Sequence, residues 1–445
     1  MPLRIVLVRH GLSSFNLEHR IQGRDDLSQL SELGVIQAKA AGTALKDLPL
    51  TAVYASPLSR AADTARHLLA ARGSAQAIVF DDDLLEVDLS PWSGLRSSEV
   101  RERFPEKARQ WLHAPAELEL EGADGRLYRP IPELLEQAQR FIDRLLERHG
   151  ADSSTMGTVL LVAHNAILRC LILQLLGRSA NDLRRLRIDN GSISVLNLER
   201  GSEGTLQVQI ESLNGIAHLG AGLPAKGAGQ RLLLVRHGET DWNRQGRFQG
   251  QIDIPLNANG RAQAQAAAAF LEVVTFQRAY TSSMARPRQT AEMILAAHPG
   301  VPLTSVPALV EIGHGLWEGC LEEEIAEGWP QLLADWKRAP HTVQMPEGEN
   351  LQDVWDRSLE GWNRIVAALD PSETALVVAH DAVNKTILCA LLGLTPADIW
   401  TVKQGNGGVT VIDYPHGPEG MPLVAALNLT THLGGVIDRT AAGAL

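Results

Sequence analysis

The chain has 445 residues, 44% of them hydrophobic, and a formal net charge of -11. Such an acidic chain has no overall positive field, so we expect no nucleic acid and no membrane as partners, and any anionic ligand must be held by a local cluster of cations. The first residues turn polar too soon for a signal peptide, and no apolar run approaches the roughly 18 residues of a membrane span. These features predict a soluble, cytoplasmic protein.

The tripeptide Arg-His-Gly occurs twice, each time directly after a short apolar run. It stands at residues 9–11 after the run 4–8, and at residues 236–238 after the run 231–235. An apolar run of this length predicts a buried strand, and the tripeptide then places a cation and an imidazole at its carboxyl end, where open α/β sheets build their sites. The glycine is expected to let the backbone turn sharply away.

Many other residues recur at a nearly constant offset, which falls slowly from 227 to 216 along the chain. The recurring pairs are Asn16 and Asn243, Arg20 and Arg247, Ser56 and Ser282, Arg60 and Arg286, Thr64 and Thr290, Glu86 and Glu311, Trp92 and Trp317, Trp111 and Trp336, and His164 and His380. A period above 200 indicates a duplicated domain and not a solenoid, whose repeats are far shorter. We therefore expect one domain over residues 1–220 and a second over 231–445, joined by a Gly-rich linker at 221–230.

The order of predicted elements is the same in both copies. The opening strand is followed by an Ala-rich helix, expected at residues 31–47 and 258–273. A short β-like run then leads into a helix that begins with Ser-x-x-x-Arg, and a later apolar run ends at a histidine before another helix. Strands alternating with helices predict an α/β fold. We expect two tandem three-layer α/β/α domains, each a mostly parallel sheet with helices on both faces.

Polar residues of one kind gather at these strand ends. Each copy supplies two histidines, two arginines and one glutamate: His10, His164, Arg9, Arg60 and Glu86, then His237, His380, Arg236, Arg286 and Glu311. The guanidinium fork matches the oxygens of a phosphate, and the helix amino termini after Ser56 and Ser282 are expected to add backbone donors. One such histidine alone is usually a core residue, but five residues recurring in order favour a phosphoryl-binding pocket.

The motifs resemble the histidine phosphatase superfamily, also called the phosphoglycerate mutase family. The resemblance is carried by Leu7 to Gly11, by Leu234 to Thr240 with Trp242-Asn243, by Ser-x-x-x-Arg-x-x-x-Thr, by the glutamate before Trp-x-Gly and by the late Ala-His. It covers both copies and implies a phosphoglycerate mutase-like fold for each.

The resemblance also implies roles for the recurring residues. His10 or His237 would take the phosphoryl group, and Glu86 or Glu311 would protonate the departing alkoxide and then activate water. The transferring group would be held by Arg9, Asn16, Arg60 and His164, and in the second copy by Arg236, Asn243, Arg286 and His380. We expect neither a metal nor a cofactor.

Three functions stay open. Mutase members of the family carry Glu-Arg-His-Tyr-Gly around the acid and an Arg-Arg-containing insertion over the site, from which Glu86-Val87-Asp88-Leu89 and Glu311-Ile312-Gly313-His314 depart. Without that cover, water should reach the phosphoenzyme, which favours a metal-independent phosphomonoesterase over a mutase. The third function is a non-catalytic module, in one copy or both, that binds phosphorylated metabolites. Copy one has Leu12 where copy two has Glu239, so we expect copy one to have drifted in specificity.

The substrate is a small phosphorylated metabolite whose identity the sequence leaves open. The tandem arrangement, with Ile21-Gln22-Gly23 and Glu86-Val87-Asp88-Leu89, resembles a two-domain branch of the family that acts on a sugar-acid phosphate in photosynthetic cells; phosphoserine, phosphoglycerate and other sugar phosphates are alternatives. Residues 96–129 and 320–345, which should contact the leaving group, are predicted to be irregular or weakly helical. The oligomeric state is also open, a homodimer included.

Overall fold

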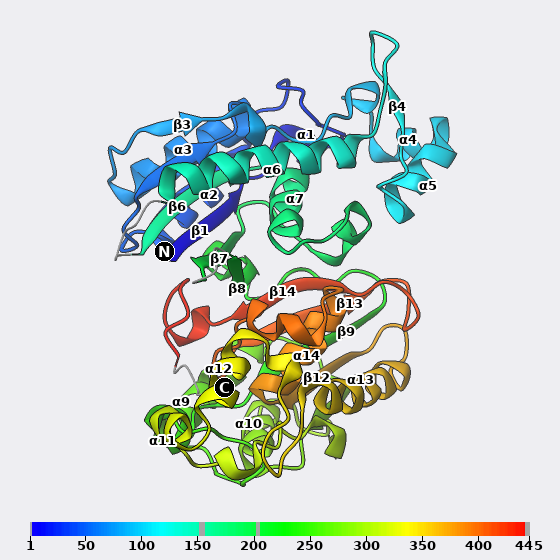
Figure 1. Cartoon of the computed structure of the whole chain (residues 1–445). Helices are drawn as coiled ribbons and strands as arrows, with labels where there is room; N and C mark the ends of the chain where they lie inside the picture. The colour runs from blue at the N-terminus through cyan, green and yellow to red at the C-terminus, as the bar shows by residue number, and fades with distance from the viewer. Residues whose placement is uncertain (1, 151–155, 202–204, 441–445) are drawn as a thin grey trace. The chain divides into compact units, whose positions relative to one another are not determined.

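The computed structural model describes residues 2–150, 156–201 and 205–440. The chain divides into two compact units, one formed by Met1–Gln209 with Leu213–Ala221 and the other by Ile210–Ser212 with Gly222–Leu445 (Figure 1). The predicted domain ranges also include residues that lie outside the described part, namely 1, 151–155, 202–204 and 441–445.

The first unit is built on a mixed, mostly parallel sheet in the order β3-β2-β6-β1-β7-β8. Parallel pairing joins β1 to β6, β6 to β2 and β2 to β3, and β7 runs antiparallel to β1. The strands are β1 (Pro2–Arg9), β2 (Ala52–Ala55), β3 (Ile78–Phe80), β6 (Gly157–Ala163), β7 (Ile193–Arg200) and β8 (Leu206–Gly215). The helices that connect them are α1 (Ser14–Leu17), α2 (Glu32–Ala44), α3 (Ser59–Arg72), α6 (Pro130–His149) and α7 (Asn165–Leu175).

Both faces of this sheet are covered. Successive side chains of a strand point to opposite faces. Ile5 and Leu7 of β1 line a small apolar cavity together with Phe141 of α6 and Leu171 of α7. Val6, on the opposite face, is also completely buried. The expected sheet with helices on both sides is therefore present in this unit.

The second unit repeats the arrangement in the order β14-β13-β9-β12-β10-β11. The neighbouring strands β9, β12, β10 and β11 are parallel, and β13 is antiparallel to both β9 and β14. The strands are β9 (Gln230–Arg236), β10 (Arg278–Thr281), β11 (Leu303–Ser305), β12 (Thr374–Ala379), β13 (Val409–Tyr414) and β14 (Leu423–Leu429). The helices that connect them are α8 (Asp241–Gln245), α9 (Ala258–Leu271), α10 (Ala285–Leu295), α13 (Leu351–Ala367) and α14 (Asp381–Leu391). Leu233 and Val235 of β9 pack in one core cluster with α9 and α10.

Several predicted boundaries shift by a few residues. Gln230, which the sequence placed in the linker, is the first residue of β9. The Ala-rich helix expected over residues 31–47 ends earlier, at Ala44. No helix in the described ranges combines the length and apolar character that a membrane span requires.

The segments expected to be irregular are largely ordered. Residues 96–129 form α4 (Ser97–Arg103), α5 (Pro105–His113) and an antiparallel pair, β4 (Leu120–Glu121) with β5 (Leu127–Tyr128). Residues 320–345 form α11 (Glu322–Gly328) and α12 (Pro330–Arg338). Each pair of short helices meets at a proline that begins the second helix, which explains the weak helical pattern in the sequence.

The glycine of each Arg-His-Gly serves a close backbone approach. Neither Gly11 nor Gly238 adopts a left-handed conformation. A Cβ on Gly11 would instead overlap the carbonyl group of Gly34 on α2, and a Cβ on Gly238 would overlap that of Gly260 on α9. The loop after the first strand thus rests directly on a helix, and this contact fixes the position of the histidine.

Candidate active site

The first histidine follows β1 directly and is held in one tautomer. Its backbone N–H donates to the Ala163 carbonyl of the neighbouring strand, at 2.9 Å. His10 Nδ1 lies 2.7 Å from the Gly11 carbonyl oxygen, which can only accept, so Nδ1 carries the proton and Nε2 keeps its lone pair. Burial, followed by the charges of Arg60 and Arg9, lowers the pKa of His10 well below its usual value. The imidazole is therefore neutral, as a nucleophile must be.

The second unit repeats this geometry and adds direct support for the tautomer. His237 Nδ1 lies 2.7 Å from the Gly238 carbonyl oxygen. Arg286 Nε donates to His237 Nε2 at 3.2 Å, which requires a lone pair on that nitrogen. Burial, then Arg286 and Arg236, lowers the pKa of His237 well below its usual value. The lone pair of His237 thus points toward a cation that binds phosphate readily.

The late histidines directly follow β6 and β12 and lie beside the early ones. The ring centroids of His10 and His164 are 5.1 Å apart, and those of His237 and His380 are 5.2 Å apart. His164 Nε2 lies 2.8 Å from the Ser56 hydroxyl, and His380 Nε2 makes the same contact with its serine. The Nδ1 atoms of both late histidines are buried without a partner among the described residues. A phosphoryl oxygen would satisfy them.

The helix amino termini after these serines each have one N–H group already bonded within the protein. The Ser59 N–H at the start of α3 donates to Asp26 Oδ1 at 2.7 Å, and the Ala285 N–H of α10 donates to Asp253 Oδ1 at 2.8 Å. A carboxylate from a preceding loop thus takes one N–H group at each terminus, and phosphate binding by the remaining N–H groups stays a prediction.

The two arginines of the first unit are held by backbone carbonyls. Arg9 Nη1 donates to the Ile188 oxygen at 2.7 Å, and Arg60 donates to the oxygens of Asp25 and Gly23, both at 2.8 Å. The Nε atoms of both arginines are buried without a hydrogen-bond partner in the described parts of the chain. The carbonyls fix the guanidinium groups without neutralising them, so their charge remains for an anion.

The arginines of the second unit are held in a similar way. Arg236 Nη1 donates to the Gln404 oxygen at 2.5 Å, and Arg286 Nη2 donates to the Gly250 oxygen at 2.8 Å. Arg236 also lies 3.3 Å from Asp381 Oδ1, a contact with no counterpart in the first unit, where residue 165 is asparagine. Burial lowers the pKa of Arg286 to about 10, and the guanidinium stays charged at neutral pH.

The side chains of the predicted asparagines, Asn16 and Asn243, are held by hydrogen bonds to their Oδ1 atoms, on the opposite side of the amide from Nδ2. Asn16 Oδ1 accepts from the Ser13 N–H at 3.1 Å and from Asn190 Nδ2 at 3.1 Å. Asn406 Nδ2 makes the corresponding contact with Asn243 Oδ1 at 3.5 Å. Asn190 and Asn406 were not predicted from the sequence, although both are followed by glycine and lie 216 positions apart, the offset of the late histidines.

The glutamate of the first unit sits at the amino terminus of α7. Glu86 Oε1 accepts from the backbone N–H groups of Val87 at 2.9 Å, Ala166 at 3.1 Å and Ile167 at 3.1 Å. These bonds fix the side chain beside His164, the N-cap of the same helix.

The glutamate of the second unit has a different electrostatic environment. Glu311 accepts from the Ile312 N–H at 3.0 Å and from the Asp381 N–H at 3.0 Å. Burial, and then the Asp381 carboxylate, raises the pKa of Glu311. Lys385 Nζ lies 2.8 Å from Asp381 Oδ2 and partly balances the pair of carboxylates. A carboxyl group with a raised pKa is suited to donate a proton.

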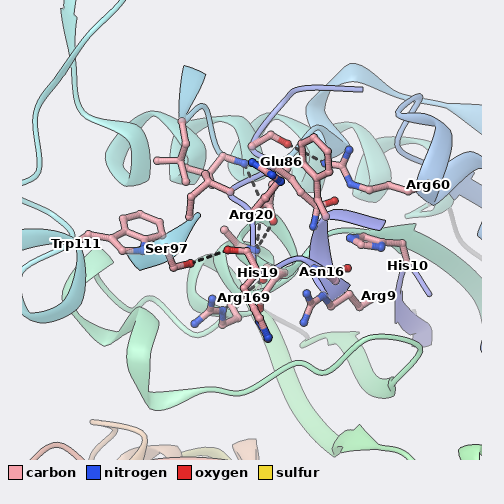
Figure 2. A pocket seen from close by; sticks show the side chains of 18 residues that line it. Arg9, His10, Asn16, His19, Arg20, Arg60, Glu86, Ser97, Trp111 and Arg169 are labelled. Carbon is pink, nitrogen blue, oxygen red and sulfur yellow. Dashed lines mark hydrogen bonds between the residues drawn. The ribbon is translucent and has the colours of Figure 1, made fainter. Parts of the chain in front are cut away.

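A pocket of about 320 Å³ opens over the first site (Figure 2). Its lining includes the predicted residues His10, Arg60 and Glu86, together with Arg20, Trp111 and Arg169. Arg169, one helical turn after Asn165, was missed because a single arginine inside an apolar helix carries no motif of its own. In the described parts of the chain, no three His, Cys, Asp or Glu side chains are grouped so that they could share a metal ion.

The difference between Leu12 and Glu239 lies outside the reacting groups. Glu239 Oε1 accepts from Asn257 Nδ2 at 2.8 Å and from Arg244 Nε at 3.0 Å, so it ties its loop to the beginning of α9. Leu12 cannot make these bonds, and this loop lacks the corresponding tie in the first unit. The geometry of His10 and His237 is nevertheless the same.

The tryptophans near the glutamates are packed in the interior. Trp92 and Trp317 are 1% and 0% exposed. The Trp92 ring centroid lies 6.4 Å from that of Trp111, and the Trp317 ring centroid lies 5.7 Å from that of Phe248. Trp92 is absent from the pocket lining, whereas Trp111 contributes to it. Trp92 therefore packs in the interior and does not face the pocket.

Known proteins resemble the chain over nearly its full length or over about half of it. A 2-carboxy-D-arabinitol-1-phosphatase of Triticum aestivum is 29% identical over 97% of this chain and 86% of its own length. Phosphoserine phosphatase 1 of Hydrogenobacter thermophilus is 33% identical and covers 46% of this chain and 94% of its own length. The solved structure of Bacillus stearothermophilus YhfR is 33% identical over 46% of this chain and 99% of its own, with a TM-score of 0.43.

The family comparison matches both units. Residues 5–210 and 232–425 each match the histidine phosphatase superfamily (branch 1), so the match covers most of the chain in two tandem regions. Both regions contain the paired histidines and buried arginines described above. The chain belongs to the histidine phosphatase superfamily.

Proposed function

We propose that each unit hydrolyses phosphate monoesters of small metabolites through a phosphohistidine intermediate, on His10 in the first unit and on His237 in the second. The observation that carries the proposal is the neutral imidazole, whose Nδ1–H is tied to a carbonyl and which lies within the field of two arginines in each unit. Such an imidazole is ready to attack phosphorus without losing a proton first.

The first step forms the phosphoenzyme. His10 Nε2 attacks phosphorus, the P–N bond forms as the P–O bond to the leaving group breaks, and Glu86 gives its proton to the departing oxygen. Arg9, Arg60 and the protonated Nδ1 of His164 hold the equatorial oxygens, where charge accumulates in the transition state.

The second step releases phosphate. Glu86, now a carboxylate, takes a proton from water as the water oxygen attacks phosphorus on the face that the leaving group has vacated. The P–N bond breaks, inorganic phosphate forms and the neutral imidazole returns. The proton and the electron pairs balance over the two steps, and neither step calls for a metal or a cofactor.

Named relatives support hydrolysis. A relative that aligns over 97% of the chain is named a 2-carboxy-D-arabinitol-1-phosphatase, and one that aligns over 46% of it is named a phosphoserine phosphatase. We infer a substrate of this size and type, a phosphorylated small molecule with polar groups near the ester. The cytoplasmic location stays a prediction from the sequence.

A mutase is the second candidate. A 2,3-bisphosphoglycerate-dependent phosphoglycerate mutase 2 of Gloeobacter violaceus is 35% identical over 39% of this chain. The assay that separates the two functions is conversion of 3-phosphoglycerate to 2-phosphoglycerate with a bisphosphate primer. Isomerisation faster than phosphate release would favour the mutase, and no isomerisation would remove it.

The proposal is tested by hydrolysis of an aryl phosphate in the presence of EDTA. We expect the full chain to release phosphate. In the double variant His10→Ala with His237→Ala the rate of phosphate release should fall at least about a thousandfold, as it does when the nucleophile is removed from other covalent hydrolases. The matched control is the double variant His113→Ala with His341→Ala, two exposed histidines outside the sites. Activity retained in the nucleophile double variant would contradict both assignments.

A further inference from the structure

Arg169 lines the pocket of the first unit and takes no part in the chemistry proposed above. The residue is 7% exposed. Its Nε donates to the Asn165 carbonyl at 3.4 Å and its Nη1 donates to the Leu183 carbonyl at 3.1 Å. Nη2 has no hydrogen bond, and no carboxylate lies within ion-pair distance, among the described residues. A buried cation whose bonds go only to neutral carbonyls can still hold an anion.

The charges around this pocket are unbalanced. Its lining contains four guanidinium groups, those of Arg9, Arg20, Arg60 and Arg169, and one carboxylate, that of Glu86. Arg9 and Arg60 are taken up by the two negative charges of a phosphate ester. Arg20 forms an ion pair with Glu18, which lies outside the lining, at 2.6 Å. When Glu86 carries the proton that the first step requires, Arg169 is the cation left over with a phosphate bound. Figure 2 shows it at the same pocket as His10.

The second unit neutralises the equivalent cation. Lys385 stands 216 positions after Arg169, the offset of the late histidines, and Asp381 stands where the first unit has Asn165. Lys385 Nζ lies 2.8 Å from Asp381 Oδ2 and 5.1 Å from the centre of the Trp400 ring. The ion pair and the ring already satisfy this cation, so it has little charge left for a ligand.

We propose that the first unit selects phosphate esters whose leaving group carries a carboxylate, which Arg169 binds. The second unit makes no such selection, because Lys385 already forms an ion pair with Asp381. The two sites of one chain therefore act on different classes of phosphate ester. This inference rests on the proposed hydrolytic function of the sites and adds the leaving group that each prefers.

The test compares two esters that differ only in this group. 3-Phosphoglycerate carries a carboxylate where glycerol 3-phosphate carries a hydroxymethyl group, and phosphate release from both is measured on the full chain. The His237→Ala variant reports the first site alone, and the His10→Ala variant reports the second site. The quantity compared is the ratio of kcat/KM for the acid to kcat/KM for the alcohol, so a general loss of activity cancels.

We expect the ratio of the first site to exceed that of the second by at least about tenfold, the usual effect of one charge-assisted hydrogen bond. Arg169→Gln should lower it by a similar factor, and Arg169→Lys should restore part of it because the charge is kept. Asn165→Asp should lower it as well, since it places beside Arg169 the carboxylate that the second unit already has. The reciprocal Asp381→Asn should raise the ratio of the second site.

Two results would count against these ideas, and they are distinguishable. If both esters are hydrolysed but Arg169→Gln and Asn165→Asp leave the ratio of the first site within about twofold of its parent, the selection by Arg169 is wrong while hydrolysis stands. If the folded His237→Ala variant hydrolyses neither these esters nor an aryl phosphate, the proposed function of the first site is wrong, and the inference fails with it.

Discussion

The two candidate acids, Glu86 and Glu311, differ in one neighbour, because only Glu311 has a second carboxylate beside it. Asp381 lies beside Glu311 in the second unit, and Asn165 takes its place beside Glu86 in the first. Burial and the Asp381 charge raise the pKa of Glu311, although Arg286 and Arg236 act in the opposite direction. A raised pKa keeps the carboxyl group protonated up to a higher pH, and the proton is what the first step of hydrolysis needs.

We predict that Asp381→Asn shifts the alkaline limb of the pH profile of the second site to lower pH. Removing the neighbouring negative charge lowers the pKa of Glu311, and Lys385, released from its partner, acts in the same direction. The measurement is kcat/KM for an aryl phosphate against pH in the His10→Ala background. The exposed Asp356→Asn serves as the control. A limb that stays in place or moves to higher pH would show that Asp381 does not set this pKa.

At the scale of elements, the sequence predicted the parts of the site that are local. His10 and His164 come at the ends of predicted apolar runs, and each directly follows a strand of the sheet. Asn190 could not be predicted in this way, since its contact with Asn16 depends on an antiparallel strand that returns from far along the chain. The role of the Arg-His-Gly glycine was also misjudged, because the sequence does not show the helix on which the loop rests.

The glycine contact makes a prediction about stability. A Cβ on Gly260 of α9 would overlap the backbone of Glu239, so Gly260→Ala must displace either the helix or the loop. We expect a loss of about 1–3 kcal/mol in the free energy of unfolding, together with a lower kcat of the second site, because the same loop carries His237. Urea unfolding and aryl phosphate turnover in the His10→Ala background measure the two effects.

The control for this contact is Gly328→Ala at the end of α11. A Cβ there meets nothing within 4 Å, and the residue does not have a left-handed conformation. We expect an unchanged or slightly higher free energy of unfolding, since alanine restricts the unfolded chain more than glycine does. Equal losses in both variants would show that the contact between Gly260 and the loop has no special role.

At the scale of the whole molecule, the duplication explains why so much of the site is predictable from one sequence. Two copies of a motif at a steady offset act as an internal comparison, and this comparison alone singles out the paired histidines, the arginines and the glutamate. It also contains the change from Asn165 to Asp381. The meaning of that change depends on three-dimensional contacts, because Arg169 and Lys385 lie one helical turn later and differ in the groups around them.

If both sites of the chain are active, we predict that their rates of aryl phosphate turnover add. We expect His10→Ala and His237→Ala each to retain part of the aryl phosphate turnover of the parent chain, and the two retained rates to sum to the parental rate, since each variant silences one nucleophile and leaves the other site intact. The measurement is the initial rate at saturating substrate for the parent and both single variants at equal concentration. If one variant keeps the full rate and the other keeps none, the silenced unit of the first is a binding module and not an enzyme. A sum well below the parental rate would instead show that each site depends on the nucleophile of the other.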